Sequence, residues 1–342
     1  MVAAAPERGE GMEKVRPGLP QGLQRILEGR GGGQKGHFFR GKEGKPGQQW
    51  AVSRKKKKYS YRDMKVDLKK LARKYPNYMK VCSIGKSADG RELYAVCLGN
   101  KGAKKRGLIQ ASMHGREWQN TKLLMVLLED CCRNYPTGSY RGISLRKLFD
   151  EVNIWIVPML NPDGVSISQF GWKIIRTPGL RDFARQEKGG KRWKANARGV
   201  DLNRNYTPGF ANEVPEEGRK PGAVGYPGNA AASEPETEAF LKLVARIKPE
   251  AVINYHQAGE VIYYREAGSL AGEIQGMAGY MAEQEQGPAN GNLGDWLSRQ
   301  GIDWCTVETG AGNAPVAHGQ FGEILKRNRR IIPLLAWWIR YS

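Results

Sequence analysis

Residues 107–118, GLIQASMHGREW, decide the fold, because an apolar run stops there at a group of polar side chains. The apolar part predicts a buried strand over 107–112, and His114 and Glu117 follow it directly. Three more apolar runs end in this way: NIWIVPML (153–160) before Asn161-Pro-Asp-Gly, AVINY (251–255) before His256, and DWCTV (303–307) before Glu308. Since sites in open α/β sheets form beyond the carboxyl ends of the strands, we expect these polar groups to meet at one sheet edge.

Helical and strand-like periodicities alternate along the chain from residue 59 onward. Met64, Leu68 and Leu71 recur at helical spacing within 63–75, and Pro76 ends that helix. Further helices are predicted over 119–133, 234–247, 293–299 and, bent at Pro333, 322–339; strands are predicted over 79–83, 93–98, 107–112, 152–158, 251–255 and 303–308. The alternation predicts an α/β fold with a mixed, largely parallel central sheet and helices on both faces.

The composition is that of a globular protein with one large or two small domains, at 342 residues, 40% hydrophobic and 26% charged. It excludes a peptide hormone, a collagen-like rod and a wholly disordered chain. Lys and Arg number 55 against 34 Asp and Glu, and the net charge of +21 attracts anionic partners such as nucleic acid, phospholipid or acidic polymers.

Neither a membrane helix nor a secretory signal is predicted. The longest apolar candidate, 331–339, is shorter than the roughly 18 to 20 residues that a membrane helix needs. Charged residues interrupt the first fourteen positions, and the five cysteines form no CxxC pair, which is typical of a reducing compartment. We therefore expect a soluble cytoplasmic protein, with an extracellular location by another route as the alternative.

Residues 1–58 differ in composition from the rest, with 14 Lys or Arg against 5 Asp or Glu and a closing run at 54–58, RKKKK. Few apolar residues and many glycines predict a basic, disordered arm, followed by one folded domain over 59–342. A solvated extension without function, a nucleic-acid or wall-binding arm, and translation starting at a later Met are the alternatives for this arm.

Two histidines and one acid at the strand ends suggest a metal site. His114 and Glu117 would face the same way if the chain coils directly after its strand, and His256 would come from a neighbouring strand. Two imidazoles and a carboxylate are typical of catalytic zinc, which keeps a fourth position for water. A chance HxxE and a hydrogen-bonded core histidine are the alternative interpretation.

Residues 193–206, WKANARGVDLNRNY, concentrate amide and guanidinium donors, and arginine is well suited to binding a planar carboxylate. Val200 and Leu202 alternate with Asp201 and Asn203, which predicts a short strand with its polar groups on one side. A solvated basic loop is the alternative.

Six motifs in order resemble the zinc carboxypeptidase family over residues 59–338: HGREW, NPDG, GVDLNRNY, SEPET, NYHQAGEVIYY and TVETG. WKANARGVDLNRNY and HQAGEVIYY are most similar to the bacterial branch that cleaves γ-D-glutamyl-diamino acid bonds in peptidoglycan peptides. The resemblance implies that His114, Glu117 and His256 bind one Zn²⁺, and that Glu308 is the general base. Asp201 would orient His114 by accepting a hydrogen bond from the ring nitrogen that does not bind the metal.

The same resemblance implies substrate contacts for Arg116, Asn203 and Arg204, the last two binding a free terminal carboxylate. The group that stabilises the oxyanion is either Lys194 or Arg198, and Arg198 is preferred because its guanidinium reaches further and stays charged. Gly294 stands where the family places its pocket residue, and we expect room there for an unusual side chain. The mobile tyrosine of the pancreatic enzymes has no counterpart in 283–290.

The sequence thus predicts a zinc-dependent exopeptidase. Its expected substrate is a peptide with a free carboxylate, derived from the cell wall and cleaved at a γ-D-glutamyl-diamino acid bond. The first alternative is an ordinary metallocarboxypeptidase acting on α-linked peptides. The second is a basic binding protein without catalysis on the same scaffold, which the charge of +21 favours. Because all four metal and base positions are filled, we do not expect nucleic acid as the partner.

Overall fold

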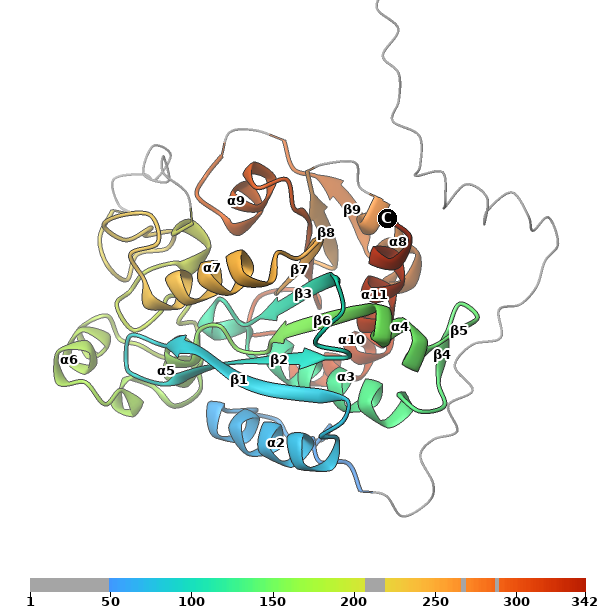
Figure 1. Cartoon of the computed structure of the whole chain (residues 1–342). Helices are drawn as coiled ribbons and strands as arrows, with labels where there is room; N and C mark the ends of the chain where they lie inside the picture. The colour runs from blue at the N-terminus through green and yellow to red at the C-terminus, as the bar shows by residue number, and fades with distance from the viewer. Residues whose placement is uncertain (1–48, 207–218, 266–268, 287–288) are drawn as a thin grey trace, which may run out of the picture.

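A mixed sheet of eight strands organises the chain in the computed structural model, which describes residues 49–206, 219–265, 269–286 and 289–342. The strands lie in the order β1-β2-β6-β3-β7-β10-β8-β9 (Figure 1). They are β1 (Met79–Lys86), β2 (Glu92–Leu98), β3 (Lys105–Ala111), β6 (Val152–Val157), β7 (Ala251–His256), β8 (Val261–Tyr264), β9 (Met281–Gln284) and β10 (Asp303–Glu308). The pairs β6/β3, β3/β7, β7/β10 and β8/β9 are parallel and the other three are antiparallel, which confirms the predicted fold class.

Helices cover both faces of this sheet. They are α2 (Tyr61–Lys74), α3 (Gln119–Asn134), α4 (Leu145–Glu151), α5 (Pro162–Phe170), α6 (Pro178–Gln186), α7 (Pro235–Ile247), α8 (Ser269–Ala278), α9 (Leu293–Arg299), α10 (Phe321–Asn328) and α11 (Ile331–Tyr341). A two-stranded ribbon, β4 (Ser139–Tyr140) with β5 (Ile143–Ser144), lies outside the main sheet. No helix within the described residues has both the length and the apolarity that crossing a membrane requires.

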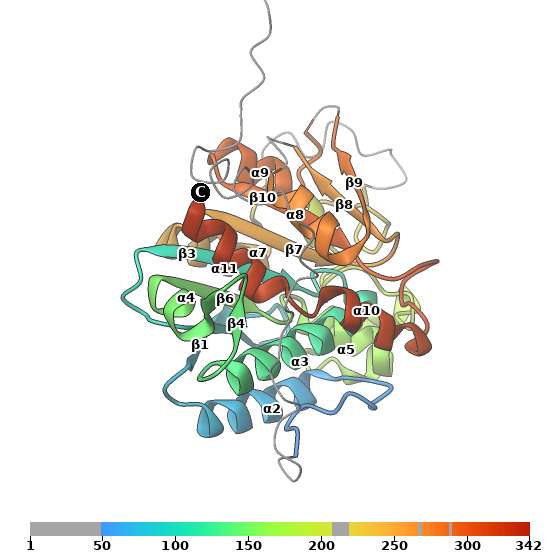
Figure 2. The same cartoon turned by 90° about the vertical axis from the view of Figure 1, so that its right-hand side faces the viewer.

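Alternation along the central strands divides the core into two layers. In β3, Leu108 packs with the side chains of α7 and α9, whereas Ile109 packs with those of α3 and α11. In β7, Val252 and Ile253 repeat this division. Figure 2 shows α3, α10 and α11 on the near side of the sheet. The central strands are therefore buried on both faces, which explains their nearly continuous apolar sequences.

Two sequence predictions differ from the structure. The helix predicted over 322–339 is two helices, because α10 ends at Asn328 and Pro333 lies in the first turn of α11, where the lack of an N–H group is tolerated. The short strand predicted around Val200 is absent, since Leu202–Arg204 forms a 3-10 turn instead. Local alternation over four residues was too weak to specify a strand there.

Residues 49–58 pack against α3, although we expected the folded domain to begin at residue 59. The Glu129 carboxylate accepts hydrogen bonds from the backbone N–H groups of Ala51 (3.0 Å) and Val52 (2.9 Å). Val52 is fully buried, and the Lys122 ammonium donates to the Lys56 carbonyl at 2.9 Å. Residues 1–48 lie outside the described part, so the disordered arm stays a prediction for them.

Candidate active site

Parallel pairing of the central strands brings the predicted site residues together. β3 and β7 are neighbours, and His114 follows the end of β3, while His256 closes β7. β10 pairs with the other side of β7 so that Glu308 lies opposite His256 in register. The expected meeting of strand ends at one sheet edge is observed for these three residues.

A 3-10 turn, Gly115–Glu117, turns the Glu117 carboxylate back toward His114. This turn packs against the start of α5 so closely that a Cβ atom on Gly115 would lie 2.3 Å from the carbonyl carbon of Gly164. Asn161 caps α5 by accepting from the Gly164 N–H at 2.8 Å and donates to the Met113 carbonyl at 2.9 Å. The NPDG motif therefore supports the HGRE turn through backbone contact.

His114, Glu117 and His256 form a compact buried cluster whose ligand atoms lie within 4.8 Å of one another. The Nδ1 atom of His114 lies 2.7 Å from Glu117 Oε1, and the Nδ1 atom of His256 lies 2.9 Å from Glu117 Oε2. The two Nδ1 atoms are 3.1 Å apart. Burial would raise the pKa of Glu117, yet the two imidazoles hold it well below its usual value, so this carboxylate is ionised.

This donor set fits zinc. Two nitrogens bound to one zinc ion at ~2.0–2.1 Å in tetrahedral geometry lie ~3.3 Å apart, close to the separation of the two Nδ1 atoms. Each imidazole is held through its other nitrogen, because His114 Nε2 lies 3.1 Å from Asp201 Oδ1 and His256 Nε2 lies 2.8 Å from the Asn254 side-chain amide. Asp201 and Asn254 thus aim both Nδ1 atoms at the same point.

Glu308 lies beside this cluster as a partly desolvated acid. Burial raises its pKa to about 7, while His256, Lys194 and Arg116 favour its charged form. Its Oε2 atom is buried and has no hydrogen-bond partner among the described residues. A carboxyl group whose pKa lies near neutrality suits proton transfer.

Lys194 and Arg198, the two candidates for oxyanion stabilisation, occupy different places. The Lys194 ammonium lies 2.6 Å from Asp201 Oδ2, and its backbone carbonyl accepts from the Gly115 N–H at 2.8 Å. Arg198 lines a different pocket from Lys194, and its half-exposed side chain lies 3.8 Å from the Glu234 carboxylate. The structure therefore places Lys194, and not the preferred Arg198, at the metal-ligand cluster, because the loop between them turns at Asn196.

Asn203 and Arg204 lie on the 3-10 turn that follows Asp201. The Asn203 side-chain oxygen accepts from the Leu293 N–H at 3.1 Å at the start of α9, and Arg204 donates to the Asn203 carbonyl at 2.8 Å. Arg204 forms no ion pair with any described residue, so its charge is available to a ligand. The room expected at Gly294 is filled, since a Cβ atom there would lie 2.6 Å from the Trp304 indole.

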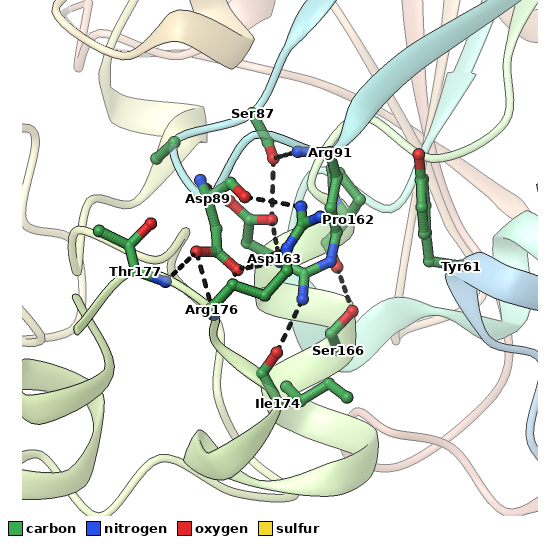
Figure 3. Close-up of polar contacts among 12 residues, drawn as sticks. Tyr61, Ser87, Asp89, Arg91, Pro162, Asp163, Ser166, Ile174, Arg176 and Thr177 are labelled. Carbon is green, nitrogen blue, oxygen red and sulfur yellow. Dashed lines mark hydrogen bonds and ion pairs between the residues drawn. The ribbon is translucent and has the colours of Figure 1, made fainter.

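The sequence did not predict a buried ionic cluster between α5 and the turn that joins β1 to β2. Figure 3 shows Arg91 between Asp89 and Asp163. Its Nη1 atom lies 2.6 Å from a carboxylate oxygen of each. Ser87 donates to Asp163 at 2.8 Å, which ties the NPDG motif to the turn after β1. Asn254 was also missed, although its position two residues before His256 on the same strand face was a usable signal.

Comparisons with known proteins agree with this geometry. The sequence model of the family described as zinc carboxypeptidase matches residues 64–301. Gamma-D-glutamyl-L-diamino acid endopeptidase 1 of Lysinibacillus sphaericus is 29% identical over 299 residues, which cover 80% of this chain and 71% of that protein.

Solved structures share the fold. Thrombin-activatable fibrinolysis inhibitor is 18% identical with a TM-score of 0.66, the match covering 82% of this chain and 74% of that one. Murein-tripeptide amidase MpaA from Escherichia coli O157 is 22% identical with a TM-score of 0.50, the match covering 78% and 94%. Since the family model matches well over half of its length, the chain belongs to the zinc carboxypeptidase family and is a zinc metallopeptidase.

Proposed function

We propose that this protein is an exopeptidase that hydrolyses γ-D-glutamyl-diamino acid bonds in peptides derived from cell-wall peptidoglycan. The observation that carries the exopeptidase assignment is the guanidinium of Arg204, which has no acidic partner among the described residues and lies next to Asn203 near the cluster. A charge in that position suits a free terminal carboxylate, which would restrict cleavage to the end of a peptide.

His114, Glu117 and His256 would hold the zinc ion, whose chemistry is to acidify a bound water and polarise the scissile carbonyl. Glu308 accepts a proton from the attacking water and then donates it to the leaving amine, in keeping with its pKa near neutrality. Lys194 supplies positive charge beside the carbonyl oxygen as the oxyanion develops. Asp201 keeps His114 oriented and keeps the Lys194 ammonium in place.

The γ-D-glutamyl specificity is supported by the similarity to the Lysinibacillus endopeptidase. The ordinary α-peptide carboxypeptidase is the competing activity.

The test is a comparison of two substrates with purified protein. L-Ala-γ-D-Glu-diaminopimelate should be cleaved with a higher kcat/KM than an N-blocked α-linked dipeptide with a free C terminus; the reverse preference would contradict the γ-specificity. Glu308→Gln should keep its zinc and lose about 10²- to 10⁴-fold in kcat, whereas Glu323→Gln, an exposed acid on α10, should behave like the unmodified protein. Near-normal turnover by Glu308→Gln would refute its role as the base.

A further inference from the structure

A basic pocket of about 400 Å³ lies beside the cluster of His114, Glu117 and His256. Its lining includes Arg116, which precedes Glu117 in the chain, and Asp201, which lies 3.1 Å from His114. Its other walls come from residues 187–195, which follow α6, and from residues 222–225. The buried Trp193 also lines the pocket, and its indole N–H holds it in place by donating to the Asn196 carbonyl at 3.1 Å. The pocket is thus part of the active-site wall.

Cations dominate the lining of this pocket. Five of its side chains are positively charged and two are carboxylates; the cations are Arg116, Lys188, Lys191, Arg192 and Lys194. Of the two carboxylates, Asp201 is already bound by Lys194 and His114. Lys188, Lys191 and Arg192 are exposed, so water screens their repulsion, but the excess of positive charge still gives the pocket a potential that attracts an anion.

Two of these cations, Lys191 and Arg192, are exposed to solvent and make no polar side-chain contact with the described part of the chain. Within the ranges that the structure describes, no hydrogen bond or ion pair involves the side chains of Lys191 or Arg192. The Nε atom of Arg116 is buried and has no hydrogen-bond partner in the same ranges. A buried guanidinium N–H without an acceptor costs free energy, so its presence beside the metal-ligand cluster points to an anionic or carbonyl ligand.

The residues proposed to hold the terminal carboxylate do not line the pocket, although the Asn203 N–H donates to Asp201 at 3.0 Å. Asn203 and Arg204 are not among its lining residues, and Asn203 contacts the start of α9 instead. Figure 1 shows α6, which precedes the pocket wall, well separated from α9. If Asn203 and Arg204 hold the leaving side of the substrate, the basic pocket faces the acyl side of the scissile bond.

The chemistry of a γ-glutamyl bond places an anion at this point. The side-chain carboxyl of the glutamyl residue forms the amide, so its α-carboxylate stays free, four bonds from the scissile carbonyl carbon and within ~5 Å of it. In an α-linked peptide the α-carboxyl group itself forms the scissile amide, which is neutral, so that residue keeps no free α-carboxylate. We propose that the pocket formed by Arg116, Lys191, Arg192 and Lys194 is a subsite on the acyl side of the scissile bond. It would bind the free α-carboxylate of a γ-linked glutamyl residue, and this inference rests on the proposed function.

Two substrates that differ only in this carboxylate test the proposal. L-Ala-γ-D-Glu-diaminopimelate and its counterpart with an α-carboxamide should differ in kcat/KM by about 10-fold in favour of the carboxylate, the effect of one charge-assisted hydrogen bond. The double variant Lys191→Gln/Arg192→Gln should reduce this preference to less than about 3-fold. The matched control Lys69→Gln/Arg73→Gln removes one Lys and one Arg from the exposed surface of α2 and should keep the full preference.

Direct binding gives a second readout that does not depend on turnover. By isothermal titration calorimetry, L-Ala-D-Glu should bind the zinc-loaded protein about 10-fold more tightly than L-Ala-D-isoglutamine, and 0.5 M NaCl should reduce that difference. Both peptides keep the γ-carboxylate, so only the α-group is compared.

The outcomes separate this inference from the proposed function. Cleavage of both γ-linked substrates at equal kcat/KM, or a preference that survives in Lys191→Gln/Arg192→Gln, overturns the subsite and leaves the γ-glutamyl activity standing. Cleavage of α-linked peptides alone overturns the proposed specificity and the subsite with it.

Discussion

The Nδ1 atoms of His114 and His256 lie 3.1 Å apart, although 142 residues separate the two histidines in the chain. Adjacent parallel strands produce this approach, since β3 delivers one ring and β7 the other to the same edge of the sheet. Two unprotonated imidazole nitrogens at that distance would turn their lone pairs toward each other. A shared cation would resolve the repulsion, and Glu117 would complete its ligand set.

His256→Ala should therefore abolish stoichiometric zinc binding. Removal of one of three protein ligands leaves a two-ligand site, which is too weak to retain the ion during dialysis. Elemental analysis should find about one zinc per chain in the unmodified protein and close to none in the variant. His318→Ala removes an imidazole that stacks on Phe321 outside the cluster and should keep full zinc content; equal loss in both variants would contradict the assignment.

Lys194→Met should lower kcat by about 10²- to 10³-fold, because a preorganised positive group beside the developing oxyanion is removed. Arg198→Met should stay within about 2-fold of the unmodified enzyme, since Arg198 pairs with Glu234 away from the cluster. Steady-state kinetics with zinc content measured in parallel separates catalysis from metal loss. A larger effect at Arg198 than at Lys194 would reverse the assignment.

Glu236 should make stability depend on pH. Burial, together with the nearby Asp163 charge, raises the pKa of Glu236 from 4.5 to about 8, so the folded state keeps a proton that the unfolded state releases. Its contribution to stability is complete below about pH 4.5 and declines as the pH rises toward about 8, on the order of a few kcal/mol.

Urea unfolding between pH 5 and pH 8 checks this dependence. Glu236→Gln should flatten the decline, because the neutral amide no longer gains charge on unfolding. Glu238→Gln, on the exposed face of the same helix, should reproduce the slope of the unmodified protein. Parallel curves for all three proteins would show that Glu236 titrates normally.

Val52→Ala should reduce the free energy of unfolding by about 2 kcal/mol, because Val52 is fully buried against the body of the domain. Val66→Ala is the matched control, since Val66 is 42% exposed on α2 and its loss should change stability by no more than about 0.5 kcal/mol. Chemical denaturation measures both. Equal, small effects would mean that residues 49–58 do not contribute to the folded unit.

The strand ends and the grouping of the candidate metal ligands were predictable from sequence because they depend on strong, long-range regularities. Apolar runs such as 251–255 and 303–307 specify buried strands, and parallel pairing then brings His256 and Glu308 together. The same reasoning placed Glu117 correctly next to His114, because a coil directly after the strand is short and has few possible conformations.

Local loop geometry was harder to predict. Nothing in the order of Lys194 and Arg198 reveals that the turn at Asn196 sends their side chains apart. Residues 49–58 dock through Val52 and through the buried Glu129, which is 77 residues from Val52 in the chain. The composition of a segment does not indicate a contact with one distant residue. Space for a substrate side chain was predicted at Gly294 because the sequence does not show that Trp304 fills it.

The order of strands in the sheet also bears on when hydrolysis becomes possible during synthesis. β3 emerges from the ribosome early, but its partner β7 follows only after residue 250, and Glu308 closes β10 later still. A nascent chain therefore lacks the full set of candidate ligands until residue 256 has been translated, and the candidate proton acceptor until residue 308 has been translated.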